Sequence, residues 1–483
     1  MAHLSSTPAS PLIQRLAGID ARSLAAFRIG LGLVLLWELT TALLNGGAFY
    51  SDSGVAPAGI LAGLNESPWI VSLHSLSGTP VWPILLITLQ IIAALCFLIG
   101  YRTQVAIIST WVLLCSLQGR NPAILHGGDT VLRLLCFWAM FLPTGARWSW
   151  DAVKKRFGSG DDRPLFSAAT LALLFQTALI YWITAMLKYG NEWTRDGTAV
   201  YYALSADQFV KAPGLWLLSN PDLCRWLTFC TWWLEILGPF VAFLPWKTAF
   251  WRMVIVAAFM SLHLGFALCL RLGPFPLIMM IAWIPFLPAS FWNRLIPGSV
   301  STHSQSDKRP WYQHGLIQIP ALLCLIYVVL WNLRSTDYKR WSGVFPTWLN
   351  PLGYALRLDQ YWALFAPKPL TDDGWLVLEA TLADGSKVDL LRNGKPVSYD
   401  KPVLISAEFP DYKWQKLEIN LYLRQFQSVR APFAHYFMNR WNEAQPSGRQ
   451  IRSWVLIYMR ETTLLHYHAI RPEKIELGRG PAQ

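Results

Sequence analysis

The segment Tyr181-Trp-Ile-Thr-Ala-Met-Leu-Lys188-Tyr-Gly-Asn-Glu-Trp193 ends an apolar run, long enough to span a membrane, with a lysine and a polar loop. A cation at this position is costly in hydrocarbon, so it needs a physical reason. One face of the expected helix carries polar residues at positions i, i+4, i+7 and i+11: Thr177, Tyr181, Thr184 and Lys188. This polar stripe must face protein or water.

The composition places most of the chain in a bilayer. Hydrophobic residues make up 53% of the 483 residues and charged residues 14%, and the apolar residues come in blocks. The sequence predicts a polytopic α-helical membrane protein with about nine transmembrane helices. The expected spans are about 24–44, 81–100, 103–118, 130–146, 166–188, 226–245, 250–270, 274–292 and 315–333. The third and fourth are short, which leaves a re-entrant or tilted pair open.

Basic residues in the short loops predict the orientation. Those that fall on one side of a nine-span arrangement are Arg15, Arg22, Arg102, Lys154, Lys155, Arg156, Lys247, Arg252, Arg294, Lys308 and Arg309. The N-terminus is then cytoplasmic, and everything after about residue 334 lies outside. The net charge of +12 is mainly a topology signal, and nucleic acid is not an expected partner. Compact loops favour a bacterial inner membrane, with the C-terminal domain periplasmic or extracellular.

The chain changes character at about residue 340. We expect a helical membrane domain over 1–337 and an extracytoplasmic β-rich domain over 338–483. Within the second domain, Trp375 to Leu382 and Lys387 to Arg392 are predicted strands joined by the turn Ala383-Asp-Gly-Ser386, Ala431 to Asn442 is a predicted helix, and Ser453 to Met459 is a predicted strand. No cysteine occurs beyond Cys324, so this domain has no disulfide of its own. No Cys or His spacing is typical of a metal site, and no metal is predicted.

Several ionisable residues fall inside the apolar blocks, where each costs about 2.5–3.5 kcal/mol unless it is paired or solvated. They are Arg28 and Glu38 in the first span, Arg133 in the fourth, Glu235 in the sixth and His263 in the seventh, with Asp129 at the start of the fourth. The topology brings His126, Asp129, Lys188 and Glu192 near the outer surface, with His263 in the outer half of its helix. We expect these residues to line one cavity open to the outside.

Each of these residues also has a purely structural interpretation. Asp129 is a good N-cap and a plausible ion-pair partner for Arg133 at i+4. Arg28 and Lys188 lie near helix ends and are able to snorkel, and His263 is open to being a hydrogen-bonded core histidine. Glu235 lies in the middle of its span and is unable to reach water at a helix end, so it needs a partner or a proton. We expect that partner to be His263, with Arg28 as the second choice.

Motifs in a fixed order carry a family resemblance. They are Ser23-Leu-Ala-Ala-Phe-Arg28-Ile-Gly, Phe49-Tyr-Ser-Asp-Ser-Gly-Val55, Gly127-Gly-Asp129 leading to Arg133, Lys188 through Trp193 with Arg195-Asp-Gly197, Glu235 followed by Pro239, His263, and Gly273-Pro-Phe-Pro276. Over about residues 20–300 the chain resembles the horizontally transferred transmembrane domain, which is the membrane part of the vitamin K-dependent gamma-carboxylase superfamily. The later segments Gln360-Tyr-Trp362 and Phe365-Ala-Pro367 are similar to the extramembrane domain of bacterial members.

The resemblance implies a chemistry for Lys188. In the animal carboxylases, a lysine at the matching position, five residues before a tryptophan matching Trp193, deprotonates vitamin K hydroquinone. Oxygen then adds to the quinol anion, and the resulting strong base removes a glutamate γ-proton before carbon dioxide attacks. Burial favours the neutral form of a lysine, so such a role is physically sensible. The carboxylases have a histidine just before the fourth helix, whereas this chain has Leu125-His126-Gly127-Gly128-Asp129, in which His126 is offset.

These expectations combine into one hypothesis: an integral membrane enzyme of the lyase type that acts on reduced vitamin K or a menaquinol-like quinol. Lys188 is the expected general base, and His126 is a weaker candidate for stabilising an oxyanion or hydroperoxide. The residues expected to shape the cavity are Asp129, Arg133, Tyr181, Thr184, Trp193, Glu235 and His263. Because the chain is too short for the whole propeptide-binding region of the carboxylases, glutamate carboxylation of a secreted peptide or protein stays an open alternative.

Two non-enzymatic interpretations stay open beside this one. A transporter would use the buried charges as ion pairs or as a proton path. A maturation or immunity partner would bind a secreted peptide through the outer domain, as some relatives of this membrane domain do. A channel would need polar stripes on several helices, and a clear one is evident only on the fifth span.

Overall fold

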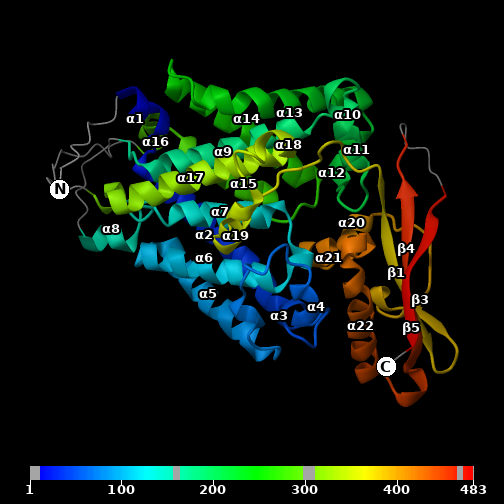
Figure 1. Cartoon of the computed structure of the whole chain (residues 1–483). Coiled ribbons are helices and arrows are strands. Elements are labelled where there is room, and N and C mark those ends of the chain that lie inside the picture. The colour runs from blue at the N-terminus through cyan, green and yellow to red at the C-terminus, as the bar shows by residue number, and fades with distance from the viewer. Residues whose placement is uncertain (1–10, 156–163, 297–309, 465–470, 482–483) are drawn as a thin grey trace.

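The computed structural model describes residues 11–155, 164–296, 310–464 and 471–481. A bundle of helices occupies one end of the molecule, and an antiparallel sheet stands across the other end (Figure 1). Three of the basic residues used to predict the orientation, Arg156, Lys308 and Arg309, lie outside the described residues.

The longer helices of the bundle follow the apolar runs of the sequence. They are α2 (Ala21–Leu44), α5 (Val81–Ile99), α6 (Thr103–Arg120), α7 (Gly127–Ala139), α9 (Ala168–Leu187), α13 (Pro221–Ala242), α14 (Thr248–Cys269), α15 (Phe275–Trp283) and α17 (Gly315–Thr336). Short helices connect them: α1 (Pro11–Ala17), α3 (Gly46–Tyr50), α4 (Ala58–Ala62), α8 (Trp150–Lys155), α10 (Asn191–Thr194), α11 (Ala199–Ser205), α12 (Ala212–Leu218), α16 (Ala289–Leu295), α18 (Tyr338–Trp341) and α19 (Asn350–Ala355). All nine expected apolar segments therefore contain helix.

Five helices in the described part of the chain are long and apolar enough to cross a membrane: α2, α5, α9, α14 and α17. The pair formed by Phe275–Phe286 and α16 is bent by 100° and gives a sixth span only if it is counted as one. Helix α7 has 13 residues, which corresponds to about 20 Å, and it is buried along most of its length. It is shorter than the hydrocarbon core of about 30 Å. The count of nine spans stays a prediction.

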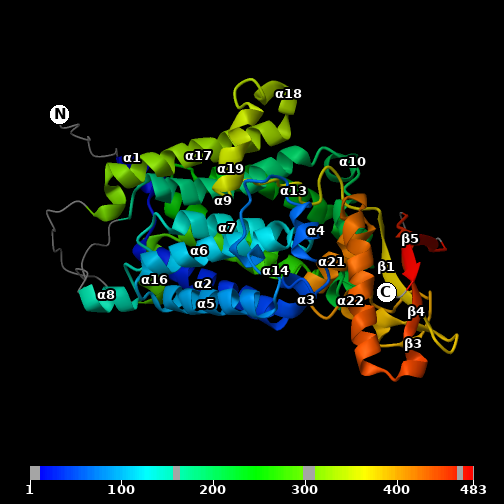
Figure 2. The ribbon, with the colours of Figure 1, turned by 60° about the horizontal axis from the view of Figure 1, so that its bottom comes forward.

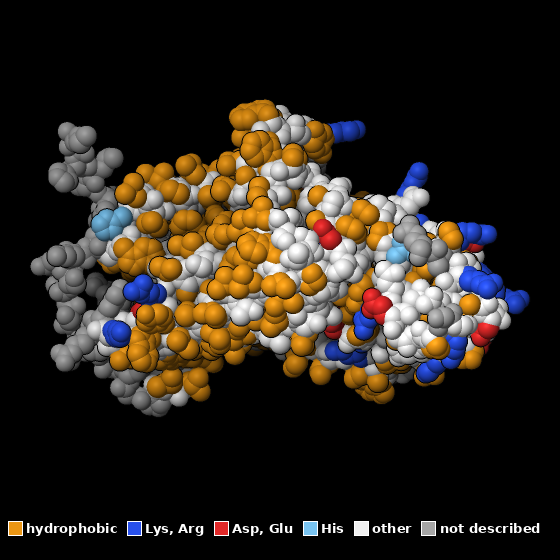
Figure 3. All heavy atoms as spheres, turned by 90° about the horizontal axis from the view of Figure 1, so that it is seen from below, with side chains coloured by type: hydrophobic (Ala, Val, Ile, Leu, Met, Phe, Trp, Pro, Cys, Tyr) orange, Lys and Arg blue, Asp and Glu red, His pale blue; other side chains and the backbone are white. Residues whose placement is uncertain are grey.

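The surface of the bundle supports a membrane protein. Apolar side chains cover much of its flank, whereas charged side chains gather on the sheet domain (Figure 3). On the candidate spans, Leu33, Ile92 and Leu264 are each more than half exposed. Exposed apolar surface of this extent is stable in lipid and unfavourable in water. Helices α1, α8 and α16, which carry or adjoin basic residues, lie at the end of the bundle away from the sheet (Figures 1 and 2).

The C-terminal part contains a five-stranded antiparallel sheet in the order β3-β2-β1-β4-β5. Its strands are β1 (Asp372–Leu382), β2 (Lys387–Asp389), β3 (Lys395–Pro396), β4 (Ile451–Thr462) and β5 (Glu473–Pro481). The expected turn over 383–386 is confirmed, because Leu382 N donates to Ser386 O and Thr381 pairs with Lys387. Three helices accompany the sheet: α20 (Ile405–Glu408), α21 (Tyr412–Tyr422) and α22 (Arg430–Ala444).

Helix α21 joins the sheet domain to the bundle, and the sequence does not predict it. Its Lys413 Nζ donates to Glu38 Oε1 of α2 at 3.0 Å, and the Tyr412 hydroxyl donates to the other oxygen of the same carboxylate. Trp414 Nε1 donates to Asn45 Oδ1 at 3.0 Å. Glu38 and Lys413 are both buried, so the charge inside the first span is neutralised by the C-terminal domain.

Arg28 of α2 is fully buried. Its guanidinium donates to the carbonyl oxygens of Thr144, Arg147 and Trp148, at 3.1, 3.2 and 2.5 Å. The alternative that this side chain snorkels to the membrane surface is therefore wrong. Arg28 instead holds the chain that follows α7 against the first helix.

Candidate functional site

A cavity of about 540 Å³ lies where the bundle meets the C-terminal domain. Its walls come from the ends of α7, α9 and α15, from α13 and α14 on one side, from the segment 363–370, and from α21 of the C-terminal domain. The size is within the range of about 300–1,000 Å³ that is usual for small-molecule sites. Seven of the nine candidate site residues line it: His126, Tyr181, Thr184, Lys188, Trp193, Glu235 and His263.

Lys188 and Glu235 form a buried ion pair in the cavity wall. Lys188 is the C-cap of α9, and its Nζ donates to both carboxylate oxygens of Glu235 on α13, at 2.8 and 2.6 Å. The side chains are only 3% and 6% exposed. The ammonium also lies 4.0 Å from the centroid of the Trp193 ring, whose Nε1 donates to Phe365 O. The lysine is thus held by a carboxylate and an aromatic face, and it does not snorkel.

The expected partners of Glu235 were wrong, although the expectation of a bonding group near it is confirmed. His263 of α14 instead bonds through Nε2 to the Tyr181 hydroxyl at 2.7 Å. Trp283 Nε1 donates to the same hydroxyl oxygen at 3.0 Å. The indole is only a donor, so the tyrosine oxygen accepts its hydrogen, while the bond to His263 Nε2 runs in either direction according to the imidazole tautomer.

This arrangement leaves one ring nitrogen of His263 without a partner. In a neutral imidazole bonded at Nε2, Nδ1 is a donor in one tautomer and an acceptor in the other. His263 Nδ1 is buried and has no hydrogen-bond partner among the described residues. Because His263 lines the cavity, a polar group without a partner stands at the wall of an apolar chamber, as ligand-binding groups do.

The predicted polar stripe of α9 does face protein. Thr177 Oγ1 donates to Leu173 O at 3.1 Å and to Ala282 O at 3.3 Å, and Thr184 Oγ1 donates to Ile180 O at 2.6 Å and to Trp362 O at 3.1 Å. With Tyr181 and Lys188, all members of the stripe are buried. The stripe therefore supports the segment around Trp362, and its last three members, Tyr181, Thr184 and Lys188, line the cavity.

His126 lines the cavity as the N-cap of α7. Its Nδ1 accepts a hydrogen bond from Gly128 N at 2.9 Å, while its backbone N donates to Asp129 Oδ2 at 2.8 Å. Because Nδ1 is occupied as an acceptor, only Nε2 is available to a ligand, and it lies 3.5 Å from the same Asp129 oxygen.

Asp129 and Arg133 do not line this cavity, which corrects the expectation that they shape it. Asp129 instead completes the capping box of α7. The expected ion pair between them is also wrong: Arg133 Nη2 pairs with Asp359 at 3.1 Å, and its Nη1 donates to Gln118 Oε1 at 3.2 Å. Both residues fix the helix end that presents His126.

The C-terminal domain contributes cavity residues that the sequence does not reveal. Tyr412, Lys416 and Ile419 of α21 form part of the wall. Lys416 has no hydrogen-bond or ion-pair partner within the described ranges, and burial lowers the pKa of its ammonium. Lys368 also lines the wall and lies 3.9 Å from Glu192. The spacing of residues in the sequence does not predict these positions, because they reach the cavity only when α21 packs on the bundle.

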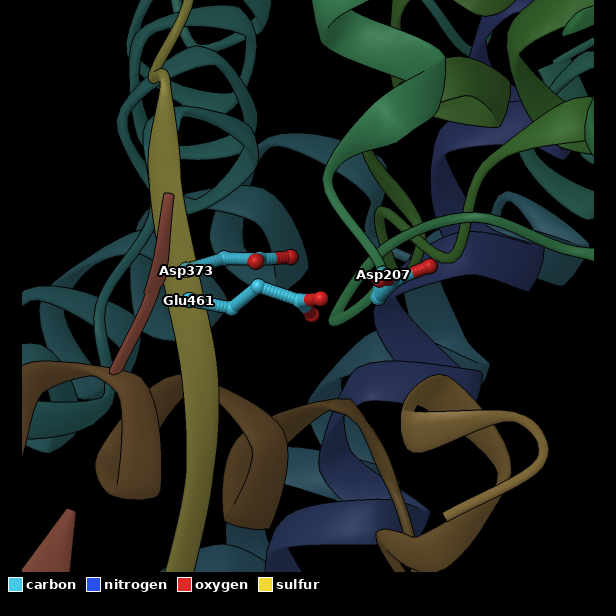
Figure 4. A group of neighbouring side chains, drawn as sticks. All are labelled: Asp207, Asp373 and Glu461. Atoms are coloured by element: carbon cyan, nitrogen blue, oxygen red, sulfur yellow. The ribbon is translucent and has the colours of Figure 1, made fainter. Parts of the chain in front are cut away.

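A second group of polar residues lies between the bundle and the sheet (Figure 4). The carboxylates of Asp373 on β1 and Glu461 on β4 point toward Asp207, which follows α11, and ligand atoms of the three lie within 4.8 Å of one another. Lys401 Nζ already lies 2.5 Å from both Asp207 Oδ2 and Glu461 Oε2. Burial and the neighbouring carboxylates raise the pKa of Asp373 to about 7. The group therefore joins the two parts of the molecule through Lys401, which contacts Asp207 of the helical part and Glu461 of the sheet.

No family model, curated protein or solved structure matches this chain. A function is therefore proposed from the geometry of the cavity.

Proposed function

We propose that this protein is an integral membrane enzyme, resembling vitamin K-dependent gamma-carboxylase, in which Lys188 deprotonates a quinol-like, lipid-soluble molecule. The observation that carries the proposal is the bidentate Lys188–Glu235 pair in the wall of an apolar cavity of about 540 Å³. An ion pair that served packing alone would gain nothing from facing an open chamber, since burial of both charges is costly. A perturbed charge pair in a cleft is a reason to expect chemistry.

The proton balance of the proposed step uses both members of the pair. The Glu235 carboxylate takes one proton from the Lys188 ammonium, and the amine then takes the proton of a bound hydroxyl group. The pair gains one positive charge while the ligand gains one negative charge, so the site stays neutral. In a site of low dielectric constant the new charges attract strongly at short range. His263 Nδ1, which has no partner among the described residues, would offer a hydrogen bond to a polar group of the ligand, as a donor or an acceptor according to its tautomer.

The proposed topology has about nine spans, a cytoplasmic N-terminus and the sheet domain outside a bacterial inner membrane. It is supported by the grouping of α1, α8 and α16 at the end of the bundle opposite the sheet. The cavity then opens at the outer leaflet. Carboxylation of glutamate in a secreted peptide is the reaction that the resemblance implies, and its substrate would reach the cavity beside α21.

The test compares two buried lysines that are each bonded to a carboxylate. Lys188→Arg keeps a cation next to Glu235 but removes the base, because arginine has a pKa above about 12. Lys413→Arg makes the same change outside the cavity, next to Glu38. With a reduced naphthoquinone as substrate, Lys188→Arg should lose quinol oxidation or epoxidation by at least 100-fold, and Lys413→Arg should retain it.

Mass spectrometry of lipid extracts from the purified protein provides the second measurement. A copurifying quinone would agree with the proposal. Full activity of Lys188→Arg would contradict the general-base role. The absence of any bound quinone together with proton-coupled uptake of a solute would favour the transporter instead.

A further inference from the structure

The cavity runs along two neighbouring helices in the outer half of the bundle. On α13, its wall contains Leu227, Thr231 and Glu235, which are spaced by four residues. On α14, it contains Ser261, Gly265 and Cys269, again spaced by four. Each row spans about 12 Å of helix. The Lys188–Glu235 pair lies at one end of the α13 row.

The α14 row also reaches the outer surface of the bundle. Ser261 is exposed although it lines the cavity, and Gly265 is partly exposed. Leu264 and Leu268, which share this side of the helix by their spacing, are 52% and 54% exposed. Because α14 is a candidate membrane span, this side faces hydrocarbon. The cavity therefore has an edge at the lipid.

Gly265 leaves the edge open. A Cβ atom added at this position would meet no heavy atom within 4 Å. By contrast, a Cβ at Gly238 on α13 would lie 2.7 Å from the Phe259 ring. Gly238 thus serves close packing of the two helices, whereas Gly265 lies beside free space. Gly265 therefore places no side chain at this edge of the cavity, and a larger residue there would extend into the free space.

We propose that the cavity opens sideways to the bilayer between α13 and α14, and that a hydrocarbon tail lies in this opening across Gly265. The polar head of the same molecule would reach Lys188 and the free Nδ1 of His263. His263 is 2% exposed and its ring points to the interior side of α14, whereas Ser261 and Gly265 lie on the side that reaches the surface. All three residues line the same cavity, so the unpartnered Nδ1 and the open edge belong to one chamber. The occupant is a lipid with a polar head and a long apolar tail. Its quinol head rests on the proposed function, whereas its tail does not.

The experiment measures binding of two naphthoquinones, menadione without a tail and a menaquinone with an isoprenoid tail, to the full-length protein in nanodiscs. Gly265→Phe fills the opening, and Leu264→Phe places the same ring on the lipid-facing side as the matched control. We expect Gly265→Phe to weaken binding of the tailed quinone by at least tenfold and to change menadione binding by less than twofold. Leu264→Phe should change neither. Gly265→Ala, whose Cβ meets only free space, shows whether the fold tolerates the position.

A second measurement separates this inference from the proposed function. The tailed molecules retained by each purified variant are extracted and quantified by mass spectrometry, whether they are quinones or phospholipids. Loss of a retained tailed molecule from Gly265→Phe but not from Leu264→Phe supports the opening even if the head is no quinol. Equal retention in wild type and Gly265→Phe would overturn it, as would an equal loss of affinity for both naphthoquinones. Wild-type protein that binds neither quinone and retains no tailed molecule would overturn it as well.

Discussion

Removal of one member of the Lys188–Glu235 pair should destabilise the bundle far more than removal of both. At about 2.7 Å and an effective dielectric constant of about 20, two unit charges attract by about 6 kcal/mol. Desolvation offsets most of this energy, so the intact pair contributes little net stability. A single substitution, Glu235→Leu or Lys188→Met, leaves one charge buried without its partner, which costs about 3–5 kcal/mol. The double variant should lie within about 2 kcal/mol of the wild type.

The two single variants should differ from each other. In Glu235→Leu the remaining ammonium keeps the Trp193 ring at 4.0 Å, and a desolvated cation–π contact contributes about 2 kcal/mol. In Lys188→Met the remaining carboxylate has no such contact, so this variant should be the less stable one. Titration of unfolding in mixed detergent and sodium dodecyl sulfate gives the three free-energy differences. Additive effects in the double variant would refute a coupled pair.

Three further predictions concern the C-terminal domain. Since burial raises the pKa of Asp373 from 3.8 to about 7, the free energy of unfolding of this domain should fall as pH rises from about 4 to about 7 and then level off, and Asp373→Asn should flatten this profile in thermal melts. Glu38→Gln leaves the buried Lys413 ammonium without its carboxylate partner, so the free energy of unfolding should fall by about 3–5 kcal/mol, measured as faster proteolysis of the domain. An unchanged rate of proteolysis would show that this contact contributes little to docking. A cysteine introduced in 374–394 should react with an impermeant thiol reagent from outside intact cells, whereas one near Lys154 should not, and the reverse order would exclude the proposed topology.

The helices and strands were the predictable part of the fold. Span 250–270 corresponds to α14 (Thr248–Cys269), and the strand predicted over 375–382 lies within β1. Long apolar runs and the turn residues at 383–386 act locally, so their signal survives in any surroundings. Helix α21 was missed because its polar residues have no apolar run. Lys413 and Gln415 of this helix are buried only through partners in the bundle.

Most of the candidate site residues were predictable, but Asp129 and Arg133 do not line the cavity, and the pairing of the others was not predicted. Lys188 was found because a lysine that ends an apolar run is costly wherever it lies. Its partner Glu235 is 47 residues away on another helix. The sequence gives no reason to choose between Lys188 and His263 as that partner, because both are polar groups at similar depth. The choice depends on how α9, α13 and α14 rotate about their axes, which their packing determines.

The contacts of α21 make the C-terminal domain a wall of the cavity. Lys413 binds Glu38 of the first helix, while Tyr412 and Lys416 face the chamber that contains Lys188. A movement of the sheet domain that broke the Glu38 contact would therefore withdraw part of the cavity wall and admit water to the Lys188–Glu235 pair. Water would weaken the attraction within the pair and screen any charge formed on a ligand. Docking of the C-terminal domain and the proposed chemistry of Lys188 would thus be coupled through one helix.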